Sequence, residues 1–261
     1  MLRSKRKNKG VLKTFNYKDV IHYKKYGDSV LSFLDESNNE VVGINVVDSL
    51  VDIPDAALND KKSIKCLGFG LGGTTLISIN NRWRCMFGST TLKTEYSPIV
   101  LPAPKDSKQI LRQVTIPRIN GKSVMQPGDM LRIFTESIKL GVANIHTRSF
   151  FFGSTGSLAT DIEIDAVAAP TSSTNVLVEL FEFYRMADSA GSSVIMKNLS
   201  KGGYKVNLGA TQDVSVLPGE SITIPNMDSN DTIVTFSAVL NGTSDTFTNN
   251  NWNVELLSTG P

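Results

Sequence analysis

Cysteine and histidine are scarce in this chain, with two of each among 261 residues. Cys66 and Cys85 are too few for a disulfide-stabilised scaffold, and only His22 and His146 are left to complete the four ligands of a structural zinc site. We therefore expect no metal and no other cofactor. Two reduced, partly buried thiols are favoured over a disulfide between Cys66 and Cys85, which stays open as the alternative.

Long apolar runs are missing as well. No stretch approaches the roughly 20 apolar residues that a membrane-spanning helix needs, so we expect no contact with a membrane. No serine, cysteine or carboxylate lies beside His22 or His146 in a manner typical of a catalytic triad. No pair of carboxylates stands out for glycoside hydrolysis either. The sequence therefore predicts a protein that is not an enzyme.

Acidic residues are nearly absent from the start of the chain. Residues 1–25 hold nine basic residues and one acidic residue, against 27 and 25 in the whole chain, so this segment carries about +8 and the remainder about −6. Such an arm can bind a phosphate backbone through counterion release. It can also dock on acidic protein, including neighbouring copies, or remain a solvated tail, and we favour protein docking or a solvated tail over nucleic acid. The residues predicted to dock on a particle or on nucleic acid are Arg3, Lys5, Arg6, Lys7, Lys9 and Lys13.

From residue 64 onward the chain contains many short β-prone runs separated by Gly, Pro, Asn and Ser. Within 231–240, for example, Val234, Phe236, Ala238 and Leu240 would share one strand face and form part of the core. Many short strands with frequent turns are typical of a sandwich or jelly roll. We predict strands over residues 74–80, 82–87, 109–117, 130–137, 148–153, 159–168, 175–184, 193–198, 204–208, 212–216, 221–224, 231–240 and 252–257.

The predicted fold is all-β: a jelly-roll-like β-sandwich preceded by the basic arm and a small N-terminal region without a clear pattern. Residues 16–35 could contain a short helix interrupted by Gly27, and Pro54 could open a helical turn over 55–58. Three prolines stiffen 96–106, which we take as a connector. The predicted divisions are 1–60 as basic arm and anchoring segment, 61–108 as a β-hairpin around Asn80-Asn81 with the connector, and 109–261 as the jelly roll.

Two motifs favour a structural role over a ligand site. The glycines of 68–73 could cradle a phosphate, but that chemistry needs a helix after them, and a β-like run follows, so we expect tight turns. Asp161, Glu163 and Asp165 would share one face of a strand and could hold calcium. A solvated outer face, with Ile162 and Ile164 buried behind it, is the favoured interpretation.

The C-terminal part resembles a known family in several segments. Val114-Thr115-Ile116-Pro117, followed by the Gly128-Asp129 turn into Met130-Leu131-Arg132-Ile133, is similar to the opening strands of that family. The runs at 150–155, 221–236 and 253–257 are similar to its third and closing strands. The family comprises the jelly-roll domains of tail fibres, head fibres and spikes of tailed bacteriophages. The resemblance covers about residues 109–261, while the basic start and the region 184–213 depart from it.

This resemblance implies a virion structural protein of a bacteriophage: a fibre, spike, collar or capsid-decoration component that forms a trimer. Its N-terminal region would dock on other virion proteins, and the sandwich would serve assembly or attachment to a host-surface receptor. The alternative is a jelly-roll capsid shell protein whose basic arm contacts packaged nucleic acid. A carbohydrate-binding protein is a third hypothesis, with Trp83 and Trp252 as stacking residues. We expect the loops 138–148 and 241–251 to form the exposed recognition surface.

Overall fold

The computed structural model describes the backbone of residues 23–26, 30–34, 40–86, 88–141, 146–169, 174–188, 191–206, 210–216, 221–241 and 244–258. Its side chains are described within the same ranges from residue 46 onward, except for 165–175 and 197–220. In these ranges the chain forms strands and two short 3-10 helices, η2 (Leu50–Asp52) and η3 (Ala56–Leu58).

The strands are β1 (Tyr23–Tyr26), β2 (Val30–Leu34), β3 (Glu40–Val47), β4 (Ser63–Cys66), β5 (Thr74–Ile79), β6 (Arg82–Cys85), β7 (Gly88–Glu95), β8 (Ile99–Val100), β9 (Gln109–Ile116), β10 (Arg118–Ile119), β11 (Lys122–Ser123), β12 (Met130–Leu140), β13 (His146–Gly153), β14 (Ile162–Ala169), β15 (Thr174–Arg185), β16 (Ser192–Val206), β17 (Ala210–Val216), β18 (Ser221–Pro225), β19 (Thr232–Leu240) and β20 (Thr246–Ser258).

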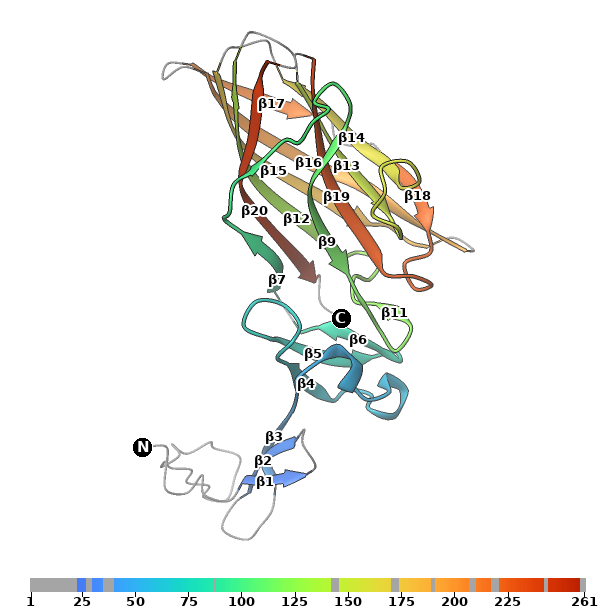
Figure 1. The fold of residues 1–261 in the computed structure, drawn as a ribbon. Helices are drawn as coiled ribbons and strands as arrows, with labels where there is room; N and C mark the ends of the chain where they lie inside the picture. Colours follow the sequence, from blue (N-terminus) through green and yellow to red (C-terminus); the bar gives the residue numbers. More distant parts are fainter. Residues whose placement is uncertain are drawn as a thin grey trace.

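The first six strands form one sheet in chain order, which we call the N-terminal sheet (Figure 1). The helix considered for 16–35 is wrong where the chain is described, because β1 and β2 pair with each other and β2 pairs with β3. Neighbouring strands here override a weak local pattern. The turn after Pro54 is confirmed as η3, with Asp55 Oδ1 accepting a hydrogen bond from Ala57 N at 3.0 Å. The hairpin at Asn80-Asn81 is confirmed, and both residues have positive φ.

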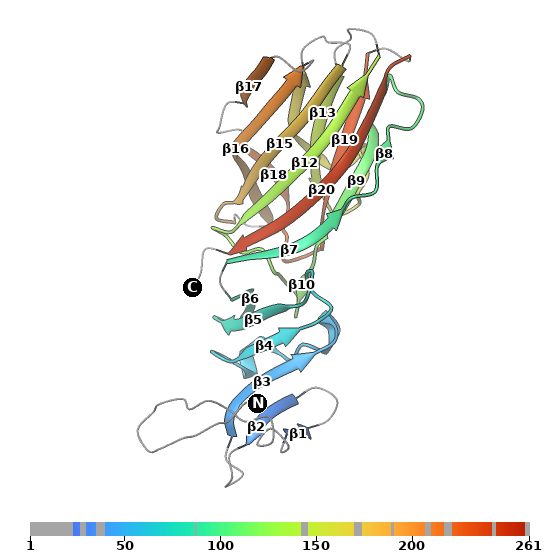
Figure 2. The ribbon, with the colours of Figure 1, turned by 90° about the vertical axis from the view of Figure 1, so that its left-hand side faces the viewer.

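Two facing sheets form the sandwich above the N-terminal sheet (Figures 1 and 2). One contains the order β7-β20-β12-β15, and the other is β9-β19-β13-β14. In chain order these strands pair first with last (β7–β20), second with seventh (β9–β19), third with sixth (β12–β15) and fourth with fifth (β13–β14). A long antiparallel ribbon wrapped around a core gives this pairing, which is the jelly roll. The predicted all-β jelly-roll-like sandwich is therefore confirmed.

The strands β16, β17 and β18 are an insertion between the sixth and seventh strands of the jelly roll. β16 pairs with β15, and both β17 and β18 pair with β16, so the insertion widens the first sheet to eight strands, β8 included. The predicted strands at 193–198 and 204–208 are parts of the single strand β16. Much of the region 184–213, which departs from the phage family, is this insertion.

The sandwich begins before residue 109, where we placed its start. β7 pairs with β20 along its length, and β8 also pairs with β20. The proline-rich segment is therefore a crossing between the two sheets, since β8 within it pairs with β20 of one sheet and β9 after it pairs with β19 of the other. The sequence of β7, GSTTLKTE, hides this role because its one buried residue is Thr90 and its single large apolar residue is Leu92.

Aromatic rings fill the half of the sandwich interior that is nearer the N-terminal sheet. The ring of Phe150 lies 4.6 Å from Phe181, 5.2 Å from Phe236 and 5.3 Å from Phe183, measured between centroids. Trp252 stacks on Phe236 at 5.6 Å. These rings come from both sheets, so they hold the two layers together. In β19 the predicted core face of Val234, Phe236, Ala238 and Leu240 is buried as expected.

We expect Phe150→Ala to lower the free energy of unfolding by about 3–5 kcal/mol, because it removes the ring around which the others pack. Urea denaturation followed by tryptophan fluorescence measures this change. Ile110→Ala on β9 is the control, since Ile110 is 39% exposed, and its effect should stay within about 0.5 kcal/mol. Equal losses in the two variants would contradict this description of the core.

Candidate functional site

The predicted docking residues Arg3, Lys5, Arg6, Lys7, Lys9 and Lys13 lie outside the described residues, as does His22. Charged side chains form buried or partly buried contacts at two places in the described part of the chain. One lies between the N-terminal sheet and the sandwich, and the other lies at the opposite end of the sandwich.

The N-terminal sheet meets the sandwich through an arginine of its edge strand β6. Arg82 Nη2 lies 2.6 Å from Asp228 Oδ2, and Nη1 lies 3.2 Å from Oδ1, so the guanidinium binds the carboxylate in a bidentate manner. The same Nη1 also donates to Gln126 Oε1 at 3.0 Å. Arg84, two residues further along β6, forms an ion pair with Asp129 at 3.4 Å. Such two-point contacts fix orientation as well as distance.

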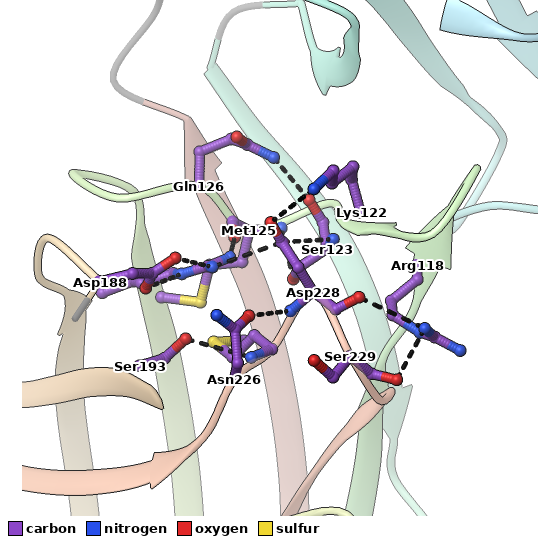
Figure 3. A network of polar contacts seen from close by, with 12 residues as sticks. Arg118, Lys122, Ser123, Met125, Gln126, Asp188, Ser193, Asn226, Asp228 and Ser229 are labelled. Carbon is purple, nitrogen blue, oxygen red and sulfur yellow. Dashed lines mark hydrogen bonds and ion pairs between the residues drawn. The ribbon is translucent and has the colours of Figure 1, made fainter. Parts of the chain in front are cut away.

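Asp228 collects further partners from the sandwich (Figure 3). Its Oδ1 accepts from Ser123 N at 3.0 Å and lies 3.4 Å from Arg185 Nη2, while Lys122 Nζ lies 3.6 Å from Oδ2. Burial would raise the pKa of Asp228, but the Ser123 N–H and the charges of Arg82 and Arg185 outweigh it and hold the pKa below its ordinary value. We call the contacts of Arg82, Ser123, Gln126, Arg185 and Asp228 the polar junction.

Arg185 anchors the sandwich side of the polar junction. It is fully buried at the end of β15 and donates to both carboxylate oxygens of Asp188, at 3.2 and 2.6 Å, and to the carbonyl oxygen of Met125. Its backbone is fixed too, since its N–H donates to the carbonyl oxygen of Asp129 at 3.1 Å. The junction therefore rests on a rigid support.

Charged residues are buried at the other end of the sandwich, which we call the distal end. Lys139 of β12 and Asp245, just before β20, form an ion pair at 3.1 Å with both side chains fully buried. Arg148 of β13 forms an ion pair with Glu179 of β15 and so joins the two sheets. Losing one partner of such a pair leaves an uncompensated buried charge, which is strongly destabilising. The distal end is thus a polar continuation of the aromatic core.

The loops expected to form the recognition surface meet at the distal end but are shorter than predicted. β12 continues to Leu140 and β13 begins at His146, so most of 138–148 is strand, and β20 occupies 246–251. The turns that begin at Gly141 and Leu240 lie together, because a Cβ at Gly141 would overlap the carboxylate of Asp245. Gly141 also has a φ of +134°, which strains any other residue.

His146 is buried among these charges with no hydrogen-bond partner on either ring nitrogen. Its ring lies 5.5 Å from that of Phe247. Burial lowers the pKa of His146 to about 3; the positive charges of Arg148 and Lys139 act in the same direction, and Asp245 opposes them. The imidazole is therefore neutral at ordinary pH and shielded from solvent, and a substrate cannot reach it.

The other motifs also have structural roles. The glycine run 68–73 is followed by β5 rather than a helix, and Gly70, Gly72 and Gly73 have positive φ, which confirms the predicted turns. Asp161 accepts hydrogen bonds from Thr155 Oγ1 at 2.7 Å and from Gly156 N at 2.8 Å, so it orders a loop.

Burial confirms some predictions for single side chains and corrects others. Ile164 is buried as expected, but Ile162 is 38% exposed, so that part of the prediction is wrong. Cys66 and Cys85 are free, buried thiols, and burial raises the pKa of Cys85 to about 11. Trp83 and Trp252 are both buried and present no platform for a sugar.

In the described part of the chain no cluster of three or more His, Cys, Asp or Glu side chains could hold a metal ion. None of the helices described there is long and apolar enough to cross a membrane.

Asp228→Asn should release the N-terminal sheet from the sandwich, because it removes the charge shared by Arg82 and Arg185. We expect a loss of about 3 kcal/mol in the stability of this contact and a faster backbone hydrogen exchange in β4–β6 than in β12 or β19. Hydrogen exchange read by mass spectrometry measures both regions at once. Asp231→Asn is the matched control, since Asp231 is exposed and contacts Arg118, at 3.3 Å from the guanidinium and 3.1 Å from the backbone N–H. Unchanged exchange in β4–β6 would mean that the remaining contacts, among them Arg84–Asp129, hold the two parts together without the charge of Asp228.

His146 makes stability depend on pH in a defined window. Its pKa is about 3 in the folded chain against 6.5 ordinarily, so the unfolded chain binds the proton first and stability falls as the pH drops below about 6.5. The slope approaches about 1.4 kcal/mol per pH unit. His146→Phe should remove this slope between pH 6.5 and 5, a range above the ordinary pKa of carboxylates, in thermal unfolding by circular dichroism. His22→Gln serves as the control; if it flattens the profile instead, His146 is not the sensor.

No family model matches this chain, and no curated protein matches it. Solved structures give remote similarities. A structure of the Gt strain of infectious bursal disease virus has 7% identity and a TM-score of 0.27, covering 87% of this chain and 42% of that one. For the Gx strain the values are 10%, 0.20, 75% and 47%. A legume lectin-like domain from Entamoeba histolytica has 13% identity and a TM-score of 0.21, covering 60% and 89%. This chain thus spans less than half of the two viral chains, and similarities of this size do not identify a family.

Proposed function

We propose that this protein is a structural component of a virion, attached to the particle through its N-terminal region and displaying the sandwich for assembly or host attachment. The observation that carries the proposal is the jelly-roll strand pairing, from first with last to fourth with fifth, in a chain that begins with a strongly basic arm. Jelly rolls of this kind are used in viral capsid and lectin domains.

The arrangement along the molecule supports this proposal. The N-terminal sheet lies at the junction end of the sandwich, and β1–β3 continue away from it (Figures 1 and 2). The turns at Gly141 and Asp245 lie at the distal end. An anchor and a display surface at opposite ends suit a protein that stands on a particle. The buried contacts of Asp228 would keep these ends in a fixed relation, as a projecting component requires.

The finer proposal is an appendage of a tailed bacteriophage, which the segments at 114–133 and 221–257 resemble. That resemblance implies a trimer, other virion proteins as partners and a receptor on the host surface. The protein would then act by binding rather than catalysis. The burial of His146 away from solvent agrees with this proposal.

A capsid shell protein is the second candidate, and the charge of the arm favours it. A segment of about +8 ahead of a jelly roll could neutralise packaged nucleic acid. The two candidates differ in what the arm touches: protein in the appendage, phosphate in the shell.

A full-length variant with glutamine at Arg3, Lys5, Arg6, Lys7, Lys9 and Lys13 separates them. As an appendage, the wild type should ignore nucleic acid at about 0.15 M salt, where exposed charges are largely screened, and particles made with the variant should contain much less of the protein than wild-type particles, by quantitative mass spectrometry.

As a shell protein, the wild type should bind nucleic acid with an affinity that falls steeply with salt, by a logarithmic slope of about 0.9 for each phosphate neutralised. The glutamine variant should lose this binding. A protein that neither enters particles nor binds nucleic acid would overturn the virion assignment.

A further inference from the structure

The fully buried ion pair at the distal end brings an amine and a carboxyl group together. Lys139 Nζ lies 3.1 Å from Asp245 Oδ2, and both side chains are completely buried. Other lysines that pair with carboxylates in the described part of the chain are Lys93, Lys108 and Lys122, whose side chains are 37–46% exposed. Their ammonium groups remain hydrated. Lys139 and Asp245 are instead held against each other away from bulk solvent.

Strand register explains why these two side chains meet. β12 and β20 run antiparallel side by side (Figure 2), and Lys139 is directly opposite Phe247. Asp245 lies two residues before Phe247, and all three residues are buried. Lys139 and Asp245 are therefore diagonal neighbours on the inward side of the sheet, a separation that a long side chain can span.

Asp245 is held in place from two further sides. Its backbone carbonyl oxygen accepts a hydrogen bond from Lys105 Nζ at 2.6 Å. Lys105 is itself tied to β19, because its carbonyl oxygen accepts from Leu240 N at 2.8 Å. On the other side, the backbone of Gly141 lies so close that a Cβ there would come within 2.3 Å of Asp245 Oδ1. The carboxyl group is therefore confined next to the amine of Lys139.

Two features of this setting favour a chemical reaction between the groups. Groups that are confined in a suitable orientation at about 3–3.5 Å react with effective molarities of about 10⁵–10⁸ M. Burial also penalises the charged form of each partner. Transfer of one proton from the ammonium to the carboxylate is therefore easier here than in water, and it gives a neutral amine beside a carboxylic acid. A neutral, desolvated lysine amine is a nucleophile.

We propose that Lys139 and Asp245 join in an intramolecular isopeptide bond. Lys139 Nζ attacks the carboxyl carbon of Asp245, so that the Nζ–Cγ bond forms and the bond from Cγ to one carboxyl oxygen breaks. That oxygen leaves as water with the two hydrogens that the ammonium gives up. Atoms and charges balance, and no oxidant, reductant or co-reactant is needed. The product is a neutral secondary amide, and two buried charges are removed from the core.

The bond locks the last strand into the sandwich. It closes a covalent ring over residues 139–245, which contains β13–β19, and it ties β20 to β12 at the distal end. A cross-link of this kind restricts the unfolded chain, and the restriction grows with the length of the loop that is closed. This inference goes beyond the proposed virion role and does not depend on it.

The mass of the intact, purified full-length protein, measured under denaturing conditions, tests the bond. We expect a mass lower by one water molecule than the sequence requires. A tryptic digest should show no cleavage after Lys139, with the peptides that carry Lys139 and Asp245 still joined. A wild-type protein that keeps its full mass after prolonged incubation in the folded state would overturn the proposal and leave the two residues as an ion pair.

Two conservative variants identify the reacting groups. Lys139→Arg retains a cation beside Asp245 but has no amine that can form the bond, so it should keep its full mass with an unchanged circular dichroism spectrum. It should also migrate more slowly than the ring-closed wild type in denaturing electrophoresis. Asp245→Asn should react at the same carbon and lose ammonia in place of water, so its final mass should equal that of the wild type.

Lys105→Arg is the matched control, because Lys105 also contacts Asp245, through the backbone carbonyl oxygen. This variant should lose water as the wild type does. Loss of water that persists in Lys139→Arg would place the reaction elsewhere in the chain and overturn the proposal. None of these measurements needs a particle, so a failure of the bond and a failure of the virion role are separate results.

Discussion

The carboxylate of Asp228 joins charged groups from the N-terminal sheet and from the sandwich, next to the Arg84–Asp129 ion pair that links the same two parts. Arg82 reaches it from β6, Arg185 from β15 and Ser123 from β11. Two arginines around one buried acid would repel each other without it, so each member of the group depends on the others. This contact, together with the Arg84–Asp129 ion pair, fixes how β6 sits against the sandwich.

The insertion of β16–β18 changes what the jelly roll can do. Without it β15 would be an edge strand with unpaired backbone groups, which proteins normally protect. With β16 beside it, β15 becomes an interior strand, and its apolar outward side chains form a broad surface with those of β12. The inserted strands therefore convert an edge into the middle of a wide sheet.

Strand positions could be predicted from sequence where one face alternates clearly, as in β9, β12 and β19. β7 was missed because its one buried residue among GSTTLKTE is Thr90, which carries no apolar signal. The polar junction could not be predicted from the sequence. Arg82 and Asp228 are 146 positions apart, and no motif in the sequence connects the two residues. One of the buried charges could have been noticed in the sequence. Lys139 falls on the same face of β12 as Leu131 and Ile133, where an apolar residue is expected. A charge at an inward position indicates a partner within the core, but not which one.

The pairing of the first and last strands of the jelly roll also governs how the chain folds during synthesis. β7 can find its hydrogen-bond partner only after β20 has left the ribosome, more than 150 residues later. The N-terminal sheet needs only short-range pairing and can form early, while the sandwich waits with open edges. A chain interrupted before β20 would lack one neighbour of β12 and would leave that strand at a sheet edge. Completion of the chain thus decides when this sheet closes, because β7 and β12 gain their shared neighbour only with the last strand.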